Sequence, residues 1–113
     1  MNLPVNSEAF QNFIIQSDLF ELTRKSMYRC LENWYNDEPE RFIQEMRATF
    51  DTMVKTYHFY NETVSITKNY NFEPVLDCIT CTIRITDEED DWCMRYKAIF
   101  DYELTIIDDV VSP

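Results

Sequence analysis

The stretch WCMRYKAIFDYELTI, from Trp92 to Ile106, decides the fold. Its apolar and polar side chains alternate with a period of two, which predicts one long β-strand with a buried face and a solvated face. Tyr96 and Tyr102 fall on the apolar face, whereas Arg95 and Lys97 fall on the polar face.

Two earlier stretches, residues 63–70 and 75–86, alternate in the same way. Because short polar connections separate the three stretches, we expect an antiparallel meander of three or four strands. Ahead of them, apolar residues recur at the i, i+3, i+4 spacing of amphipathic helices over residues 8–16, 19–35 and 39–57.

The order of these elements predicts an α+β fold. We expect two to three N-terminal helices, at about residues 8–57, on one face of the antiparallel sheet, whose strands lie at about residues 62–107. A chain of 113 residues with 45% hydrophobic side chains has the size and the apolar content of one domain, so we expect a single domain over residues 1–113.

The chain contains no glycine. Walker loops, dinucleotide-binding GxGxxG turns and GxSxG nucleophile elbows all require glycine, because the backbone there takes positive φ or approaches a ligand closely. These classes of site are therefore excluded. Two-residue hairpin turns also favour glycine, so we expect the turns at residues 69–74 and 87–91 to be longer.

The net charge is −11, and the segment from Asp87 to Pro113 carries −7 of it. This distribution disfavours direct binding to nucleic acid or to an anionic membrane and favours a basic protein partner, although solubility alone is an alternative reason for it. The expected partner-binding residues are the acids of this segment: Asp87, Glu88, Glu89, Asp90, Asp91, Asp101, Glu103, Asp108 and Asp109. We expect the turn at 87–91 to be mobile and solvated, with a weak divalent-cation site as an alternative.

Metal and catalytic motifs are weak in this sequence. Cys78 and Cys81 form a CxxC pattern, but on a strand they point to opposite faces, and no second ligand pair is present. His58 is the only histidine and has no predicted catalytic partner. We therefore expect neither a metal nor a cofactor. Asp77 lies on an apolar face and needs a partner, for which Lys68 is the candidate.

The polar face of the predicted sheet gathers several of the few basic residues of the chain. A solvated sheet face is the ordinary interpretation. The alternative is a docking or homodimer face, for which the candidate residues are Arg84, Arg95, Lys97 and Ile99.

The stretch LENWYNDEPERF, from Leu31 to Phe42, resembles the opening of nuclear-transport-factor-2-like domains. Those domains also follow their helices with a curved antiparallel sheet. The resemblance implies a cleft between helices and sheet that binds a small ligand, with or without enzymatic activity. The residues that it places in the lining are Tyr57, Asp77, Tyr96 and Tyr102.

Three functions are consistent with these observations. The first is a small non-enzymatic protein that binds or inhibits a basic, nucleic-acid-handling protein, since small acidic inhibitors from phages and mobile elements have this profile. The second is the ligand-binding domain that the resemblance implies. The third is a homo-oligomeric structural module. No apolar run is long enough to span a membrane, and the first eight residues lack a secretory signal pattern, so we expect a cytoplasmic location.

Overall fold

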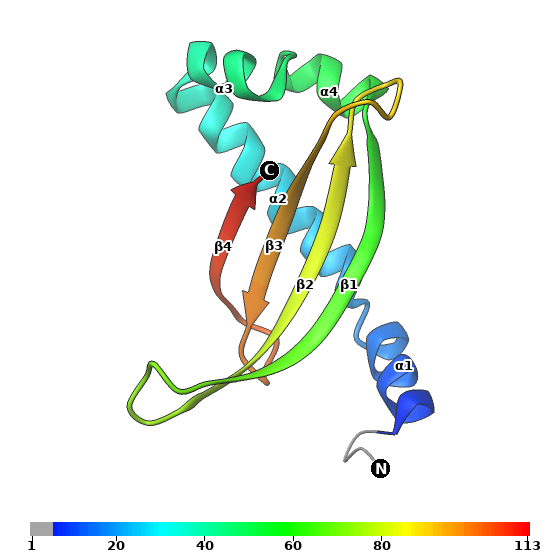
Figure 1. Cartoon of the computed structure of the whole chain (residues 1–113), viewed down its shortest axis with the longest axis vertical. Coiled ribbons are helices and arrows are strands. Elements are labelled where there is room, and N and C mark those ends of the chain that lie inside the picture. Colours follow the sequence, from blue (N-terminus) through cyan, green and yellow to red (C-terminus); the bar gives the residue numbers. More distant parts are fainter. Residues whose placement is uncertain (1–5) are drawn as a thin grey trace.

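The strand pattern and the helical pattern occur in the predicted order in the computed structural model, which describes residues 6–113 (Figure 1). Residues 1–5, which contribute to the expectation that no signal sequence is present, lie outside this range. The helices are α1 (Ser7–Gln16), α2 (Leu19–Asp37), α3 (Pro39–Met46) and α4 (Phe50–Thr56). The strands are β1 (His58–Asn69), β2 (Leu76–Thr86), β3 (Cys93–Phe100) and β4 (Ile106–Ser112).

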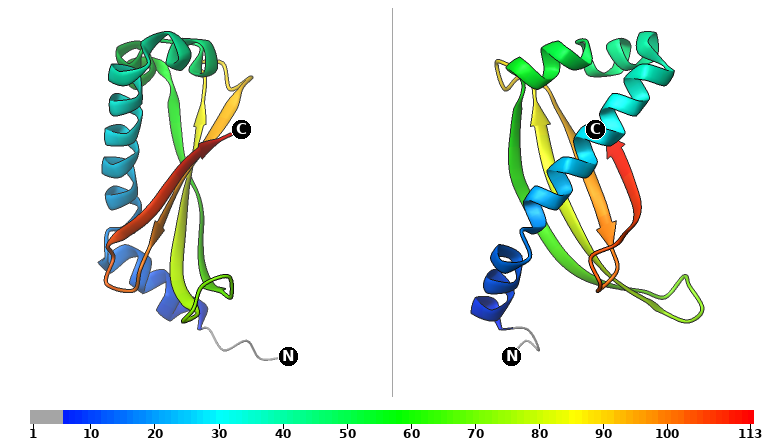
Figure 2. Two further views of the ribbon diagram at one scale, coloured as in Figure 1. Left: turned by 90° about the vertical axis from the view of Figure 1, so that its left-hand side faces the viewer. Right: turned by 180° about the vertical axis from the view of Figure 1, so that it is seen from behind.

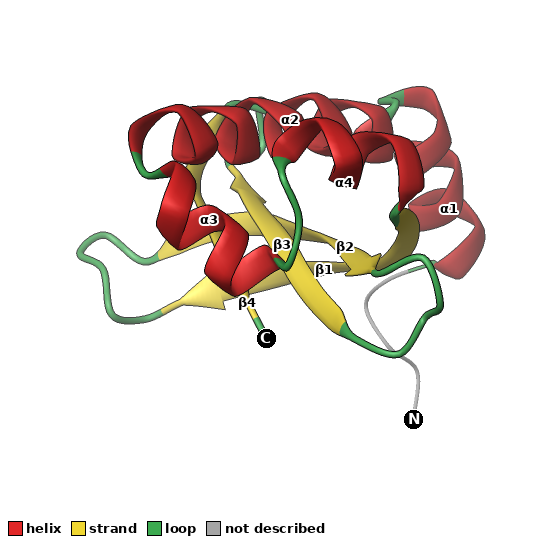
Figure 3. Ribbon diagram, turned by 90° about the horizontal axis from the view of Figure 1, so that it is seen from above, coloured by secondary structure: helices red, strands yellow, loops and turns green. Residues whose placement is uncertain are grey.

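The four strands form one antiparallel sheet in the order β1-β2-β3-β4, which confirms the predicted α+β class. α2 lies diagonally across one face of this sheet, and the opposite face carries no helix (Figure 2). Seen from above, α3 runs from the end of α2 across the end of the sheet, and α4 returns toward α2 (Figure 3). α2 therefore forms the layer over the sheet, α3 and α4 cover one end of the molecule, and the core lies between these helices and the sheet.

Alternation along the central strands determines which side chains form the core. On β2, the alternate residues Ile79, Cys81, Ile83 and Ile85 are buried against the helices. On β3 the buried set is Met94, Tyr96, Ala98 and Phe100. Leu19, Met27 and Leu31 of α2 and Phe42 of α3 complete the core from the helical side. The predicted inward face of the central strands is thus confirmed.

The single strand predicted from Trp92 to Ile106 is wrong, because the chain reverses after Phe100. The Asp101 carboxylate accepts hydrogen bonds from the backbone N–H groups of Glu103 (2.9 Å) and Thr105 (3.0 Å). Leu104 takes the left-handed conformation at φ 64°. Alternation continues through this turn by coincidence, so periodicity alone could not reveal it.

The single third helix predicted for residues 39–57 is divided into α3 and α4. Arg47 adopts a left-handed conformation (φ 65°), which ends α3. Thr49 then caps α4, because its side chain accepts a hydrogen bond from the backbone N–H of Thr52. The Tyr57 hydroxyl donates to the backbone carbonyl of Met46 (2.7 Å), which fixes the corner between the two helices.

Candidate functional site

The nine acidic residues predicted to bind a partner do not form one surface. β3 has eight residues, so it separates the turn at 87–91 from Asp101 and Glu103 by about 25 Å. Asp108 and Asp109 lie on β4, between these two ends. The charge that is continuous in the sequence is therefore divided among three places in the structure.

Asp109 is further set apart because its side chain lies on the helix-covered face. Its Oδ2 accepts a hydrogen bond from the buried Tyr96 hydroxyl (2.7 Å), and that hydroxyl also shares a hydrogen bond with the Ser26 hydroxyl (2.7 Å). Burial raises the pKa of Tyr96, and burial together with Asp109 raises the pKa of the Cys30 thiol. The role of Asp109 seen here is to join β4 to α2 through Tyr96.

The turn at 87–91 is largely exposed, as we expected, and side-chain hydrogen bonds define its geometry. Asp90 Oδ1 accepts hydrogen bonds from the Thr86 hydroxyl (2.5 Å) and the Tyr60 hydroxyl (3.2 Å). The bond from Thr86 is the main reason that the pKa of Asp90 lies below its ordinary value. The Asp87 carboxylate accepts from the backbone N–H of Asp91 (2.9 Å). These bonds leave the side chains of Glu88 and Glu89 exposed at the tip.

The helices bring further acidic residues to the same end of the molecule as this turn. Figure 1 shows α3 and α4 at the end of the molecule where α2 finishes, with α4 beside the β2–β3 connection. We call this region, residues 32–56 and 86–92, the acidic end. It contains eleven acidic and three basic side chains, a net charge of −8. The acids are Glu32, Asp37, Glu38, Glu40, Glu45, Asp51, Asp87, Glu88, Glu89, Asp90 and Asp91.

Two of the three basic residues of the acidic end make local contacts. Arg41 lies 3.1 Å from Glu45 and 3.7 Å from Glu38, and the guanidinium of Arg47 lies 5.4 Å from the centre of the Trp92 ring. The acids of residues 32–51 are visible in the sequence, but only the fold shows that they lie beside the turn at 87–91. Sequence reasoning therefore missed most of this surface.

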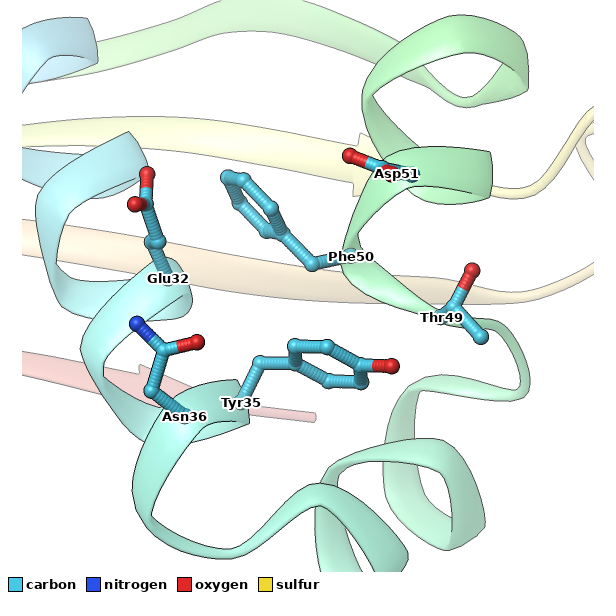
Figure 4. A pocket seen from close by; sticks show the side chains of 6 residues that line it. All are labelled: Glu32, Tyr35, Asn36, Thr49, Phe50 and Asp51. Carbon is cyan, nitrogen blue, oxygen red and sulfur yellow. The ribbon is translucent and has the colours of Figure 1, made fainter.

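A pocket of about 510 Å³ opens on the acidic end between α2 and α4 (Figure 4). Glu32 of α2 and Asp51 of α4 stand on either side of the Phe50 ring. Tyr35 forms another wall, and its ring packs edge-on against Phe42 at 5.2 Å. Two carboxylates beside aromatic rings suit a cationic group such as a lysine or arginine side chain.

The basic residues of the uncovered sheet face are engaged locally. Arg84 and Arg95 are directly opposed on β2 and β3, where like charges repel. Arg84 turns to the Tyr60 ring, 4.8 Å from its centre, and Arg95 forms a two-pronged pair with Glu62 (2.9 and 3.1 Å). Lys97 remains exposed, and Ile99 is half-buried. The face therefore lacks a concentrated positive charge.

The four residues that the family resemblance places in a cleft lie at different points of the fold. The Tyr57 hydroxyl contacts Met46, Tyr96 is buried under α2, and Tyr102 is 56% exposed in the β3–β4 turn. Asp77 pairs with Lys68 at 2.8 Å, the partner expected for it. Of the five pockets that we describe between residues 6 and 113, one includes Tyr57 and none includes the other three.

The remaining sequence candidates are placed as follows. Cys78 and Cys81 are both buried on β2, and both thiols are free. His58 Nε2 lies 3.1 Å from the backbone carbonyl oxygen of Glu88, so the histidine contacts the acidic turn.

Three further observations bear on the kind of protein this is. Within the described residues, no group of three or more His, Cys, Asp or Glu side chains is arranged to hold a metal ion. Among residues 6–113, none of the helices combines the length and the apolar character that a membrane crossing requires. Comparison of the chain with protein-family models, with curated proteins and with solved structures finds no match.

Proposed function

We propose that this protein binds a basic protein through its acidic end and thereby blocks a surface that handles nucleic acid. The observation that carries the proposal is the net charge of −8 over residues 32–56 and 86–92. Such a concentration of charge steers a positive partner at long range and discriminates against acidic ones. Lysine and arginine side chains that contact phosphates can contact carboxylates instead, so one basic surface can accept either ligand.

The geometry of the acidic end supports binding as well as solubility. The turn at 87–91 is pinned by Asp90 and Asp87, so Glu88 and Glu89 are presented at a fixed place. The pocket between Glu32 and Asp51 adds a concave feature next to these acids. Preorganised groups lose less conformational freedom on binding than mobile ones, which favours affinity.

The test uses two charge-reversal variants with the same change in net charge. The first is Glu88→Lys with Glu89→Lys, at the acidic end. The second is Glu73→Lys with Glu103→Lys, which changes exposed residues in the β1–β2 and β3–β4 turns. Each protein is immobilised and used to capture binding proteins from a native lysate at low and at high salt. Captured proteins are then assayed for nucleic-acid binding with and without the free protein.

We expect the wild type and the second variant to capture a basic protein in a salt-sensitive manner and to inhibit its binding to nucleic acid. The first variant should do both much less well. Equal capture by both variants would contradict a role of the acidic end. Capture of a basic protein whose nucleic-acid binding stays unaffected would contradict the inhibitory function.

A further inference from the structure

The sheet has two edges, β1 and β4, and they differ in how well their backbone is covered. At the start of β1, Arg24 donates from Nη2 to the backbone carbonyl of Phe59 (3.2 Å) and to Asn61 Oδ1 (2.6 Å). The ladder is irregular between Asn61 and Thr63 in β1 and at Ile107 in β4, and such irregularities discourage further pairing, so the regular part of β4 is residues 108–112. The outer edge of β4 faces the viewer in the left panel of Figure 2, with no other element in front of it.

The charged side chains of β4 oppose pairing with an acidic strand but not with a basic one. Its sequence is IIDDVVS, in which Asp108 and Asp109 are the charged residues, and it has no lysine or proline. Ile107 and Val110 are 43% and 47% exposed. The strand therefore combines apolar side chains with an open row of backbone groups.

One hydrogen bond shows which backbone groups point outward. The backbone N–H of Asp109 donates to the Asp108 carboxylate (2.9 Å) instead of to β3. Because successive residues of an edge strand alternate between inner and outer hydrogen bonding, Asp109 and Val111 direct their backbone groups to the open side. In this structure, the Asp108 carboxylate accepts the hydrogen bond that the Asp109 N–H could otherwise donate to another strand.

We propose that β4 accepts an extended, basic segment of the partner as a fifth strand of the sheet. A lysine or arginine opposite Asp108 would draw its carboxylate away and free the Asp109 N–H for the incoming strand. Asp108 and Val110 lie two residues apart on the uncovered face, so the segment should place a basic residue opposite Asp108 and an apolar residue two positions away, opposite Val110. This inference rests on the proposed function, since it assumes a basic partner.

Charge also decides between a partner and a second copy of this chain. Pairing β4 with β4 of another copy would bring Asp108 and Asp109 of both chains into one short ladder. Like charges at that spacing repel, whereas a lysine-bearing strand neutralises the same aspartates. The favoured occupant is therefore the basic segment.

The test uses a short synthetic peptide of Lys-Thr-Val-Thr repeats, which places lysine and valine in turn on one face of a strand, and a control peptide of the same sequence with N-methylation of every backbone amide. The control keeps the charge but cannot form a strand ladder. Amide hydrogen exchange of the protein is followed by NMR. With the first peptide, exchange at Asp109 and Val111 should slow by roughly tenfold or more. The N-methylated peptide should leave both amides unchanged.

Two single variants separate this site from general electrostatic attraction. Asp108→Asn and Glu103→Gln each remove one negative charge, and Glu103 lies in the adjoining turn. We expect Asp108→Asn to weaken binding of the first peptide several-fold more than Glu103→Gln does. Equal effects, or equal affinity for the N-methylated peptide without amide protection, would overturn strand addition while leaving the proposed function standing. Protection of Asp109 and Val111 that rises with protein concentration alone would instead show pairing between copies and overturn it.

Discussion

Tyr96 is the residue that connects the helical layer to the last strand. It is fully buried, and its hydroxyl lies 2.7 Å from both Ser26 of α2 and Asp109 of β4. A buried hydroxyl of this size is tolerated only because both partners are present. In the structure, Asp109 stabilises the fold through this hydrogen bond. Its charge alone had made it a candidate for contact with a partner protein.

Tyr96→Phe should destabilise the protein by about 2 kcal/mol, because it leaves two polar groups without their partner and one of them is a carboxylate. The ring packing is unchanged, so the loss comes from the hydrogen bonds. Urea denaturation monitored by circular dichroism measures the difference in the free energy of unfolding. Tyr102→Phe is the matched control, since Tyr102 is exposed, and we expect no measurable change. A Tyr96→Phe variant as stable as the wild type would show that these bonds contribute no net stability.

At the scale of elements, the sequence predicts the buried faces well and the breaks badly. Alternation identifies the inward residues of β2 and β3, because each is packed directly against α2. It overlooks the reversal at Asp101–Thr105, where Leu104 takes positive φ without being glycine. It also overlooks the break at Arg47, since the apolar spacing continues from α3 into α4. The first break is an Asx turn at Asp101, and the second is followed by the Thr49 N-cap. Neither contains glycine or proline, so both give a weak sequence signal.

The break between α3 and α4 makes a prediction about Thr49. Its side chain accepts a hydrogen bond from the Thr52 N–H (3.3 Å), and removal of such an N-cap typically costs about 1 kcal/mol. We therefore expect Thr49→Ala to lower the free energy of unfolding by about 1 kcal/mol. Thr56→Ala, at the last residue of α4, should have a much smaller effect. Both are measured by urea denaturation, and equal effects of the two variants would exclude a capping role.

The turn at 87–91 makes a prediction about pH. The pKa of Asp90 is lowered mainly by the Thr86 hydroxyl, so the charged carboxylate is favoured in the folded state. The resulting stabilisation is present above the ordinary pKa of an aspartate and is lost as the pH falls through the lowered value. In Thr86→Val, NMR titration should show the pKa of Asp90 moving up toward 3.8, and the turn should lose order. An unchanged pKa would mean that Tyr60 and the neighbouring charges suffice.

For the whole molecule, the distribution of charge follows from topology and was not predictable from charge counts along the chain. The acids of residues 32–51 and those of the turn at 87–91 are far apart in sequence, and the meander returns the second group to the end where the helices finish. The same topology carries Asp101 and Glu103 to the opposite end. Consequently the acidic end has −8 of the net charge of −11.

This concentration of like charge should make stability depend on salt. At about 0.01 M salt the Debye length is ~30 Å, so repulsion acts across the whole acidic end, whereas at about 1 M it is ~3 Å and the repulsion is screened. We expect the melting temperature to rise with sodium chloride over this range by about 5 °C, which for a domain of this size corresponds to roughly 1 kcal/mol. Differential scanning calorimetry measures the shift.

The location of the repulsion can be tested with neutralising variants. Glu88→Gln with Glu89→Gln removes two charges from the acidic end and should reduce the salt dependence clearly. Glu73→Gln with Glu103→Gln removes two charges elsewhere and should reduce it less.

Salt also weakens the exposed ion pairs Lys68–Asp77 and Arg95–Glu62, but such pairs contribute little, so repulsion should dominate. A melting temperature that falls with salt would show that the ion pairs outweigh the repulsion, and equal slopes for the two variants would show that the repulsion is not centred on the acidic end.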